Sequence, residues 1–528
     1  MKRPTIKGPT IKGLAGRALA GARRVDVTRW REMSRPPAAF AVVAVLAGGV
    51  TTAELTHRDT RPAVRPLPRT LAPVVGSIAV CPDALTTTKS VSTRVTAGVG
   101  GAGDTRVSAA KLAPGAAAEM LVEDGSRVGQ FGAGGDAAAI ASEGTAVVTT
   151  ATGPEAGGLA AEQVTRAESG AQFGLASVRC EPAVADSWYV GAATTISDKS
   201  ELFLVNPYDE VATVDVSIYT SKGVRDIPGT KGVSVGARSR VVKALADWAP
   251  DEQWLAVRVE VRAGRVSPAI RRSRSVRSVA SGVEWVPRSI PGEQVALGAL
   301  PGGEGERTLV LVNPGIDTLI AHVTVSRQDG QFTPIDLAEV EIEGQQLVAL
   351  PVSDDLDNLS AMMHVVTDGP PVIAGGFAAY LPATPGAASD FVLAGSAPAL
   401  SGPALLTDNR VGPTVDTSLM FSAPDGDAEV TLTLLTSDGS AGRTSLVPVR
   451  QGDLVVVAVS RAFGRGDPQP ILVTTSANSA AVHATRVVVE KTKQGTLMTT
   501  FAVAPQPLGG VPVPRVAHDP AGWLLTRD

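Results

Sequence analysis

Residues 201–223 read ELFLVNPYDEVATVDVSIYTSKG, and residues 308–330 read TLVLVNPGIDTLIAHVTVSRQDG. Aligned on Pro207 and Pro314, both copies place apolar side chains at every second position after the proline and end at a glycine. A period of two indicates a half-buried β-strand, and the glycine marks the turn that follows it. The proline ends the strand before it, because proline has no N–H to donate to a sheet. The phrase LVNP is therefore predicted to join two β-strands.

The residue before the proline is predicted to close the turn. The side-chain amides of Asn206 and Asn313 can bond to the neighbouring backbone. A third, weaker copy reads SLMFSAPDGDAEVTLTLLTSDG (418–439), with Pro424 in the place of the earlier prolines and Ala423 in the place of the asparagine. We interpret five residues as turn markers of a repeat: Asn206, Pro207, Asn313, Pro314 and Pro424.

The spacing of these prolines sets the size of the repeat. They lie 107 and 110 residues apart, whereas solenoid repeats have about 20 to 50 residues and a small β-sandwich has about a hundred. The sequence predicts an all-β protein of tandem immunoglobulin-like β-sandwich domains after a single N-terminal transmembrane helix. The expected order is a basic cytoplasmic tail (1–36), a transmembrane helix or signal anchor (37–54), a Pro- and Arg-rich stalk (55–71), a divergent β domain (72–182), β-sandwich repeats 1 to 3 (183–297, 298–400 and 401–507) and a C-terminal tail (508–528).

A basic segment precedes an apolar stretch near the N-terminus. Residues 1–36 hold ten Lys or Arg against two acidic residues, and eighteen uncharged residues lie between Arg35 and Glu54. This is close to the shortest run that crosses a bilayer as a helix, and positive charge stays on the cytoplasmic side. We expect a single-pass cell-membrane protein with a cytoplasmic N-terminus and an extracytoplasmic body. The alternative is a signal peptide cleaved near Ala53, which would leave the body secreted.

The chain has two cysteines, and both follow the apolar stretch. Cys81 and Cys180 would lie in a compartment that permits oxidation, where a disulfide is the simplest use for such a pair. The cysteines have no C-x-x-C spacing and no neighbouring histidine. We therefore predict a disulfide that brackets the first exported domain.

These features together resemble a known family. The apolar N-terminal segment, Cys81 and Cys180, the stretch DSWYVGAATT (186–195) and the LVNP repeat are similar to an actinobacterial family of exported proteins catalogued only as domain of unknown function 5719. The resemblance spans residues 70–505. It implies an exported location and a β-sandwich fold, and it carries no activity and no site residues.

Arginines crowd the last strands of the first LVNP repeat. On an acidic body, Arg271, Arg272 and Arg274 are a possible contact for a polyanion of the cell envelope. The alternative is a solvated strand pair whose charge is balanced by nearby Asp and Glu. The crowded arginines are Arg262, Arg265, Arg271, Arg272, Arg274 and Arg277.

Four tryptophans belong to the same repeat: Trp188, Trp248, Trp254 and Trp285. Buried, they would fill a sandwich core. Exposed, they would offer a surface on which sugars or a partner can stack.

Charge and residue spacing argue against several kinds of function. Beyond residue 36 the chain has 38 basic and 50 acidic residues, from totals of 48 and 52 less the ten and two of the N-terminal tail. Such a body lacks the basic face that nucleic-acid binding requires. The five histidines are scattered without the spacing of a metal site. We predict no catalytic, cofactor-binding or metal-ligating residues, and no cofactor.

The sequence leaves three functions open. The first is a non-enzymatic, membrane-anchored protein of the cell envelope that presents its β-sandwiches as a scaffold or interaction surface to an envelope polymer or protein partner. The second is an enzyme or accessory subunit that acts on polysaccharide or peptidoglycan, which a carboxylate-lined cleft between domains would favour. The third is a sensor, although a tail of 36 residues is too short for a folded output domain.

Overall fold

The structure, a computed structural model, describes residues 70–82, 90–96, 106–112, 121–122, 138–140, 146–153, 156–382, 386–436, 441–466, 469–508 and 510–513. These residues belong to one compact unit, Thr70–Pro514. The predicted cytoplasmic tail, the transmembrane helix, the stalk up to residue 69 and the C-terminal tail from residue 514 lie outside them. The described α-helices, α2 (Ser353–Leu356) and α3 (Val459–Phe463), are far too short to cross a membrane.

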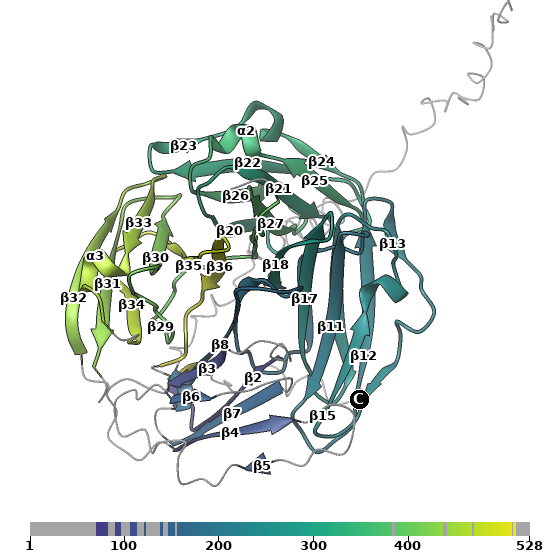
Figure 1. The fold of residues 1–528 in the computed structure, drawn as a ribbon, viewed down its shortest axis with the longest axis horizontal. Helices are drawn as coiled ribbons and strands as arrows, with labels where there is room; N and C mark the ends of the chain where they lie inside the picture. Colours follow the sequence, from purple (N-terminus) through teal and green to yellow (C-terminus); the bar gives the residue numbers. More distant parts are fainter. Residues whose placement is uncertain are drawn as a thin grey trace, which may run out of the picture. The chain divides into compact units, whose positions relative to one another are not determined.

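Antiparallel β-sheets make up nearly all of the regular secondary structure that is described, so the predicted all-β class is confirmed (Figure 1). Eight of the sheets have four to six strands, and they come in four successive groups of two along the chain. We call each group a sheet pair. The predicted boundary at residue 298 falls inside a strand, β20 (Gln294–Leu300), which belongs to the third sheet pair.

The first two sheet pairs contain the following elements. The first has β2 (Gly76–Cys81), β3 (Ser90–Thr96), β4 (Arg106–Leu112), β5 (Leu121–Val122), β6 (Ala138–Ile140), β7 (Ala146–Thr152), η2 (Ala156–Gly158), β8 (Ala160–Ala167) and β9 (Gly174–Arg179). The second has β10 (Asp186–Ala192), β11 (Asp198–Asn206), β12 (Ala212–Thr220), β13 (Gly223–Arg225), β14 (Val233–Val235), β15 (Ser239–Ala244), η3 (Leu245–Asp247), β16 (Leu255–Ala263), β17 (Ser267–Val276), β18 (Val279–Val286) and β19 (Arg288–Ser289).

The third and fourth sheet pairs follow the same plan. The third has β20, β21 (Gly305–Val312), β22 (Leu319–Arg327), β23 (Gly330–Phe332), η4 (Ile335–Leu337), β24 (Val340–Ile342), β25 (Leu347–Pro351), α2, β26 (Ala361–Thr367), β27 (Ile373–Tyr380) and β28 (Phe391–Ala394). The fourth has β29 (Ala404–Leu406), β30 (Val415–Ser422), β31 (Ala428–Leu435), β32 (Ala441–Val449), β33 (Leu454–Ala458), α3, β34 (Ile471–Thr475), β35 (His483–Lys491) and β36 (Thr496–Val503).

All four sheet pairs share one strand order when the additional short strands β14, β19 and β24 are left out of the count. One sheet joins the first, sixth, third and fourth strands of the pair, as in β2-β7-β4-β5 and β20-β26-β22-β23. The other joins the fifth, second, seventh and eighth strands, as in β6-β3-β8-β9 and β25-β21-β27-β28. The region 72–182, which lacks the LVNP phrase, therefore has the same topology as the regions that contain it.

The eight larger sheets pack in a closed cycle. Each sheet pair has its own apolar core, and further apolar clusters join every pair to the next and the fourth to the first. The joining residues include Val80 with Val205, Val190 with Phe377, Met362 with Met420, and Ala160 with Leu405. The arrangement resembles the blades of a β-propeller, whose sheets are also four-stranded. Figure 1 shows the four sheet pairs following one another in sequence order around a common centre.

This double packing explains the apolar runs that precede each proline. On β11, Leu202 and Leu204 face the core of the second sheet pair, whereas Phe203 and Val205 face the first. On β21, Leu309 and Leu311 likewise face the opposite way from Val310 and Val312. A strand buried on both faces is apolar at every position instead of every second one.

The asparagines before the prolines tie the turns together. The Asn206 side chain donates to the carbonyls of Glu210 at 2.7 Å and Gly236 at 2.9 Å, and accepts from the Tyr208 N–H at 3.0 Å. Asn313 donates to Asp317 and Ile342 and accepts from Gly315 in the same way. Both asparagines are fully buried. In the third copy, Ala423 has no side-chain amide, and the Asp427 carboxylate instead accepts from the Gln451 N–H.

The predicted disulfide is confirmed. Cys81 at the end of β2 is bonded to Cys180, one residue after β9, with their Cα atoms 4.3 Å apart. Because these are the first and last strands of the first sheet pair, the bond holds its two sheets together.

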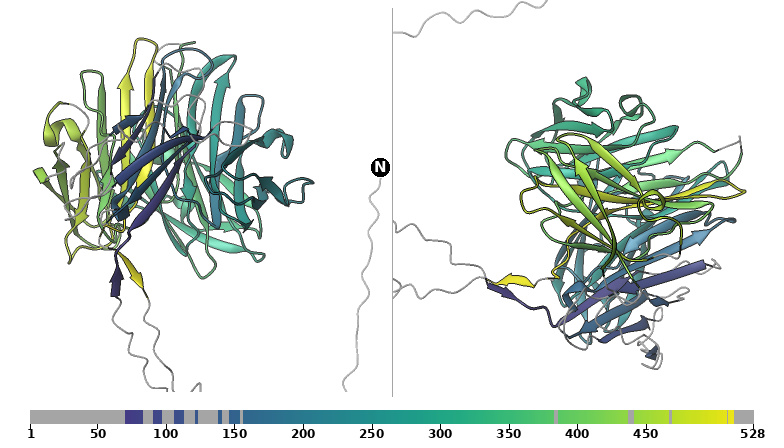
Figure 2. Two further views of the ribbon diagram at one scale, coloured as in Figure 1. Left: turned by 90° about the horizontal axis from the view of Figure 1, so that it is seen from below. Right: turned by 90° about the vertical axis from the view of Figure 1, so that its left-hand side faces the viewer.

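The first and last described strands pair with each other. β1 (Thr70–Ala72) and β37 (Val511–Val513) form a two-stranded antiparallel ribbon (Figure 2). Thr70 and Leu71, assigned to the stalk in the sequence analysis, are therefore part of a sheet. The chain enters and leaves the unit at the same place.

Candidate functional site

The eighth strands of the four sheet pairs meet at the centre of the unit. β9 contacts β18, β18 contacts β28, β28 contacts β36, and β36 contacts β9. Each is an edge strand of its own sheet, so one row of its backbone N–H and C=O groups lacks a strand partner. Because these groups are buried, they need other hydrogen-bonding partners.

A buried aspartate supplies three of the missing partners. Asp390 precedes β28 and is 2% exposed. Its carboxylate accepts the N–H of Leu175 on β9 at 3.0 Å, of Met498 on β36 at 2.9 Å and of Phe391 at 2.9 Å. Burial raises the pKa of this carboxyl well above its usual value, although the three N–H donors oppose the shift. The side chain thus links three of the four central strands.

A buried glutamate, Glu284, links two of the central strands, β9 and β18, in the same way. Glu284 on β18 accepts the N–H of Ser177 at 3.3 Å and of Trp285 at 3.0 Å. The Ser177 and Thr499 hydroxyls share a hydrogen bond of 2.8 Å beside it. Glu284 has no exposed surface, and burial raises its pKa well above the usual value, with the nearby Asp390 adding to the shift.

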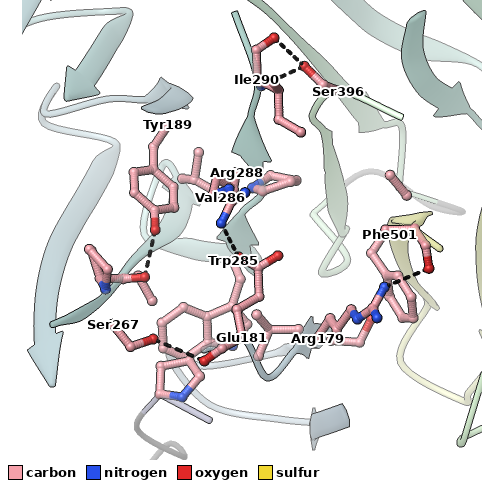
Figure 3. A pocket seen from close by; sticks show the side chains of 18 of the residues that line it. Arg179, Glu181, Tyr189, Ser267, Trp285, Val286, Arg288, Ile290, Ser396 and Phe501 are labelled. Atoms are coloured by element: carbon pink, nitrogen blue, oxygen red, sulfur yellow. Dashed lines mark hydrogen bonds and ion pairs between the residues drawn. The ribbon is translucent and has the colours of Figure 1, made fainter. Parts of the chain in front are cut away.

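Next to these carboxyls lies a pocket that strands or adjoining segments of all four sheet pairs line, the third contributing Ser396 and Pro398, which follow β28. Its volume is about 140 Å³, close to the roughly 150 Å³ of a cavity that holds one benzene molecule. Its walls are mostly apolar and include Trp285, Phe501 and several prolines. Figure 3 shows the Tyr189 ring at its edge, with the hydroxyl donating to the Pro268 carbonyl at 2.6 Å.

Three charged side chains line this pocket: Arg179, Glu181 and Arg288. Arg288 donates to the Glu181 carboxylate at 3.0 Å, and Arg179 donates to the Ala504 carbonyl at 3.0 Å (Figure 3). Burial lowers the pKa of the Arg179 guanidinium, while the Glu181 carboxylate raises it. Two guanidinium groups against one carboxylate leave an excess of positive charge.

This arrangement suits binding better than catalysis. An apolar pocket with a few convergent polar groups is the usual form of a small-molecule site. Tyr189 stays protonated because burial raises the pKa of its phenol, and no base among the residues that line this pocket lies within hydrogen-bonding reach of a nucleophile.

With the fold and pocket described, the chain can be compared with known proteins. The sequence model of a family of unknown function (DUF5719) matches residues 133–460, more than half of the chain. The chain belongs to this family. The resemblance noted in the sequence is thereby confirmed, and the matched residues include the central carboxyls and all three charged residues of the pocket.

Further comparisons add little to the DUF5719 assignment. No curated protein matches the chain. Among solved structures, the alpha-L-rhamnosidase of Streptomyces avermitilis in complex with L-rhamnose aligns at 10% identity and a TM-score of 0.12, over 81% of this chain. The chain spans 57% of the length of that protein. A TM-score this low establishes no common fold.

In this DUF5719 protein the three predicted polyanion contacts are tied to carboxylates. On β17, Arg272 is 3% exposed and pairs with Asp198 at 2.7 Å. Arg271 pairs with Glu201 at 2.8 Å and Arg274 with Glu306 at 3.4 Å. Neighbouring positions of a strand face opposite sides of the sheet, so these arginines do not form one patch. Polyanion binding here stays a prediction.

The tryptophans of the second sheet pair are largely buried. Trp188, Trp254 and Trp285 are each at most 8% exposed, and Trp248 packs against the same core from a half-buried position. Trp188, Trp248 and Trp254 therefore fill the core instead of forming an exposed stacking surface, whereas Trp285 packs between the first and second sheet pairs and lines the pocket. Among the described residues, no group of His, Cys, Asp or Glu has the arrangement of a metal site.

Sequence reasoning missed the residues at the centre. Glu284 interrupts the apolar run GVEWV, and Asp390 directly precedes FVLA. A lone carboxylate within an apolar strand was the available signal, because such a group is buried only when hydrogen bonds compensate it. Ser177 and Glu284, which share a hydrogen bond, are also 107 residues apart, the same separation as between Pro207 and Pro314.

Proposed function

We propose that this DUF5719 protein is a non-enzymatic, membrane-anchored, extracytoplasmic cell-envelope protein whose four sheet pairs surround one ligand-binding pocket. The pocket carries this proposal, because all four sheet pairs line it and its size suits a single ring or a small side chain. A scaffold without a ligand would not need a cavity with mixed apolar and guanidinium walls at the place where its repeats converge.

Two features of the chain support an extracytoplasmic location. The basic residues 1–36 and the uncharged run before Glu54 have the pattern of a signal anchor. The Cys81–Cys180 disulfide is typical of proteins in oxidising compartments. Alkaline phosphatase fused after Asp528 should be active in intact cells, and the same enzyme fused after Arg35 should be inactive. The reverse result would overturn the location.

The four sheet pairs fit the tandem sandwich that the repeat predicts. We propose that each is one copy of an ancestral two-sheet sandwich, with the first copy spanning the divergent region 72–182. The likeness to an immunoglobulin domain is limited to two antiparallel sheets around one core. The strand order here is 1-6-3-4 and 5-2-7-8, whereas an immunoglobulin domain pairs its first, second, fifth and fourth strands.

Ligand binding can be tested with probes of benzene size. We would titrate the full chain in detergent with benzamide, benzoate and phenyl phosphate by calorimetry. At least one should bind, and Ala504→Phe, which adds a ring to a residue of the pocket wall, should abolish that binding. Ala441→Phe, at an exposed position on β32, is the matched control and should bind normally. Failure of all three probes, or undiminished binding by Ala504→Phe, would overturn the pocket as a ligand site.

A second cavity favours an enzyme or accessory subunit that acts on envelope polysaccharide or peptidoglycan. It has a volume of about 390 Å³ between the second and third sheet pairs, and Asp198, Asp251 and Glu306 line it beside Trp254. Asp198 and Glu306 are held by arginines, which leaves Asp251 as the most available carboxylate. Release of reducing ends from envelope polymer by the full chain, lost in Asp251→Asn, would establish this activity. No release by the wild-type chain would remove it.

A further inference from the structure

We propose that the central pocket recognises a ligand by an anionic group, a carboxylate or a phosphate, which takes the place of the Glu181 carboxylate on Arg288. This inference rests on the proposed ligand-binding function and specifies the chemistry of the ligand. It follows from the charge of the pocket, the hydrogen bonds of its arginines and the weak internal ion pair.

The charge of the pocket runs against that of the body. Beyond residue 36 the chain is acidic, with 38 basic and 50 acidic residues, yet the residues that line the pocket include Arg179 and Arg288 against one carboxylate, Glu181. Glu162, which does not line the pocket, also acts on Arg179 but is paired with Arg486. The excess positive charge lies among apolar walls, where an opposite charge is attracted more strongly than in water. The local excess therefore selects for an anion.

The arginines have donors to spare. A guanidinium has five N–H donors in a planar fork that fits carboxylate and phosphate groups. Arg179 uses one nitrogen to donate to the Ala504 carbonyl, and Arg288 uses one to donate to Glu181. Burial lowers the pKa of Arg179, which indicates that the pocket does not fully compensate its charge. A bound anion would supply the missing compensation.

The internal ion pair is weak enough to be replaced. The side chains of Arg288 and Glu181 are 30% and 39% exposed, and ion pairs with this access to water contribute little to stability. The backbone of Glu181 is fixed by its bridge to Val80 and by the neighbouring disulfide. Its side chain can therefore turn towards solvent without disturbing the wall. Glu181 occupies the place of the ligand's anion when the pocket is empty.

The apolar walls define the rest of the ligand. Trp285 and Phe501 are at most 7% exposed, and both line the pocket together with Pro268 and Pro287. They offer flat, apolar contact to a ring or short aliphatic group. A small acidic molecule, or the acidic end of a larger one, combines both requirements.

The test compares charged and neutral probes of the same shape. With the full chain in detergent, benzoate or phenyl phosphate should bind about tenfold or more tightly than benzamide, because hydrogen bonds between ions exceed neutral ones in strength. Preference for benzoate would assign a carboxylate, and preference for phenyl phosphate would assign a phosphate. Equal affinity for benzamide would overturn the anion inference while leaving the ligand-binding pocket intact.

Two variants test the exchange itself. Glu181→Gln removes the competing charge and should raise affinity for the preferred anion by about threefold or more, and Arg288→Gln should lower it by about tenfold. Glu341→Gln and Arg265→Gln, both at exposed positions outside the pocket, are the matched controls for the change in net charge. Unchanged affinity in Glu181→Gln would show that Glu181 does not compete with the ligand. Unchanged affinity in Arg288→Gln would show that Arg288 does not hold it.

Discussion

Two seams between sheet pairs differ in chemistry. The seam between the second and third pairs, the apolar seam, is built on one shared core to which β10 and β27 both contribute. The Gly375 backbone lies close against Val190 there, and the ion pair Arg274–Glu306 crosses only at the exposed edge. The buried guanidinium of Arg272 also lies on Phe377 at this seam, but its carboxylate partner, Asp198, belongs to the same sheet pair. The seam between the fourth and first pairs, the closing seam, instead contains the buried ion pair Arg486–Glu162, with side chains 1% and 2% exposed.

Backbone groups help to hold the buried pair of the closing seam. Glu162 on β8 accepts the N–H of Thr407 at 3.1 Å and of Asp408 at 3.2 Å. Arg486 on β35 also donates to the Asp408 carbonyl at 2.6 Å, and its guanidinium lies 4.0 Å from the centre of the Phe501 ring. The charges are thus paired across the seam, as a buried ion pair requires, although the buried Nε and Nη2 of Arg486 have no hydrogen-bond partner.

The difference reflects what each seam joins. Pairs that follow each other in the chain are already held near one another by a short connection, so apolar contact is enough to dock them. The closing seam joins the first sheet pair to the last. These two pairs could dock at many relative positions that bury similar apolar area. A buried charge that fits only one backbone arrangement penalises the wrong offsets. We therefore expect the closing seam to contribute specificity more than stability.

The largest effect should come from breaking the buried pair. Glu162→Ala leaves the Arg486 charge unpaired and should lower the free energy of unfolding by about 3–5 kcal/mol. The double variant Glu162→Leu/Arg486→Met should recover part of this loss, because apolar side chains of similar volume often replace such pairs at little cost. The recovery is incomplete because the Thr407 and Asp408 N–H groups lose their acceptor. Both values would come from the midpoint of urea unfolding of the full chain.

Asp186→Ala is the control for this experiment. It breaks the ion pair with Arg258, whose side chains are 42% and 34% exposed, and should cost less than about 1 kcal/mol. If Glu162→Ala lowered the free energy of unfolding no more than Asp186→Ala, the buried ion pair would not stabilise the closing seam.

A smaller effect should come from overfilling the apolar seam. In Gly375→Ala the new Cβ would lie 2.7 Å from the Val190 Cβ and 2.8 Å from the Val190 carbonyl oxygen. Overpacking of this kind costs about 1–3 kcal/mol, read from the same unfolding midpoint. Gly76→Ala, with no atom within 4 Å of its added Cβ, should be nearly neutral. Equal midpoints for the two variants would mean that the apolar seam is loosely packed.

The local structure could be predicted because its signals are local. The strands around Pro207 and Pro314 follow from apolar spacing, the turns from the asparagine, and the disulfide from two cysteines that follow an apolar segment and lack the spacing of a metal site. The closed cycle was not predicted, although the runs LFLV and LVLV carried its signal. They show no alternation because both faces of β11 and β21 are buried, and only one such face is needed for an isolated sandwich.

The site was beyond the sequence for a different reason. Arg179 and Glu181 come from the first sheet pair and Arg288 from the end of the second, and no spacing of common charged residues reveals that they share a pocket. The arginines on β17 are close in sequence, but they do not share one face of the sheet. Arg272 alternates inwards from Arg271, and its guanidinium stacks on Trp254 and Phe377 in the core.

The smallest expected effect concerns a third seam, which joins the third and fourth sheet pairs. Two histidines lie at this seam beside an apolar cluster. His364 and His483 lie with ring centres 5.8 Å apart, and His364 shares a hydrogen bond with Ser422. Burial, followed by the charge of His483, lowers the pKa of His364 to about 3. Burial also lowers the pKa of His483, against the effects of the Ala397 carbonyl and Asp425.

Acid should therefore weaken this seam. Between about pH 6.5, the usual pKa of histidine, and pH 3, the unfolded chain binds a proton at residue 364 that the folded chain does not. Stability is then fully present above pH 6.5 and is lost as the pH falls. At pH 5.5 the loss from His364 is about 1.4 kcal/mol.

In His364→Phe the change in unfolding free energy between pH 7.5 and 5.5 should shrink by about that amount. His322→Phe, which removes a histidine with a 38% exposed side chain, is the matched control. If the unfolding free energy of His364→Phe changed with pH as much as that of the wild type, His364 would not make the third seam sensitive to acid.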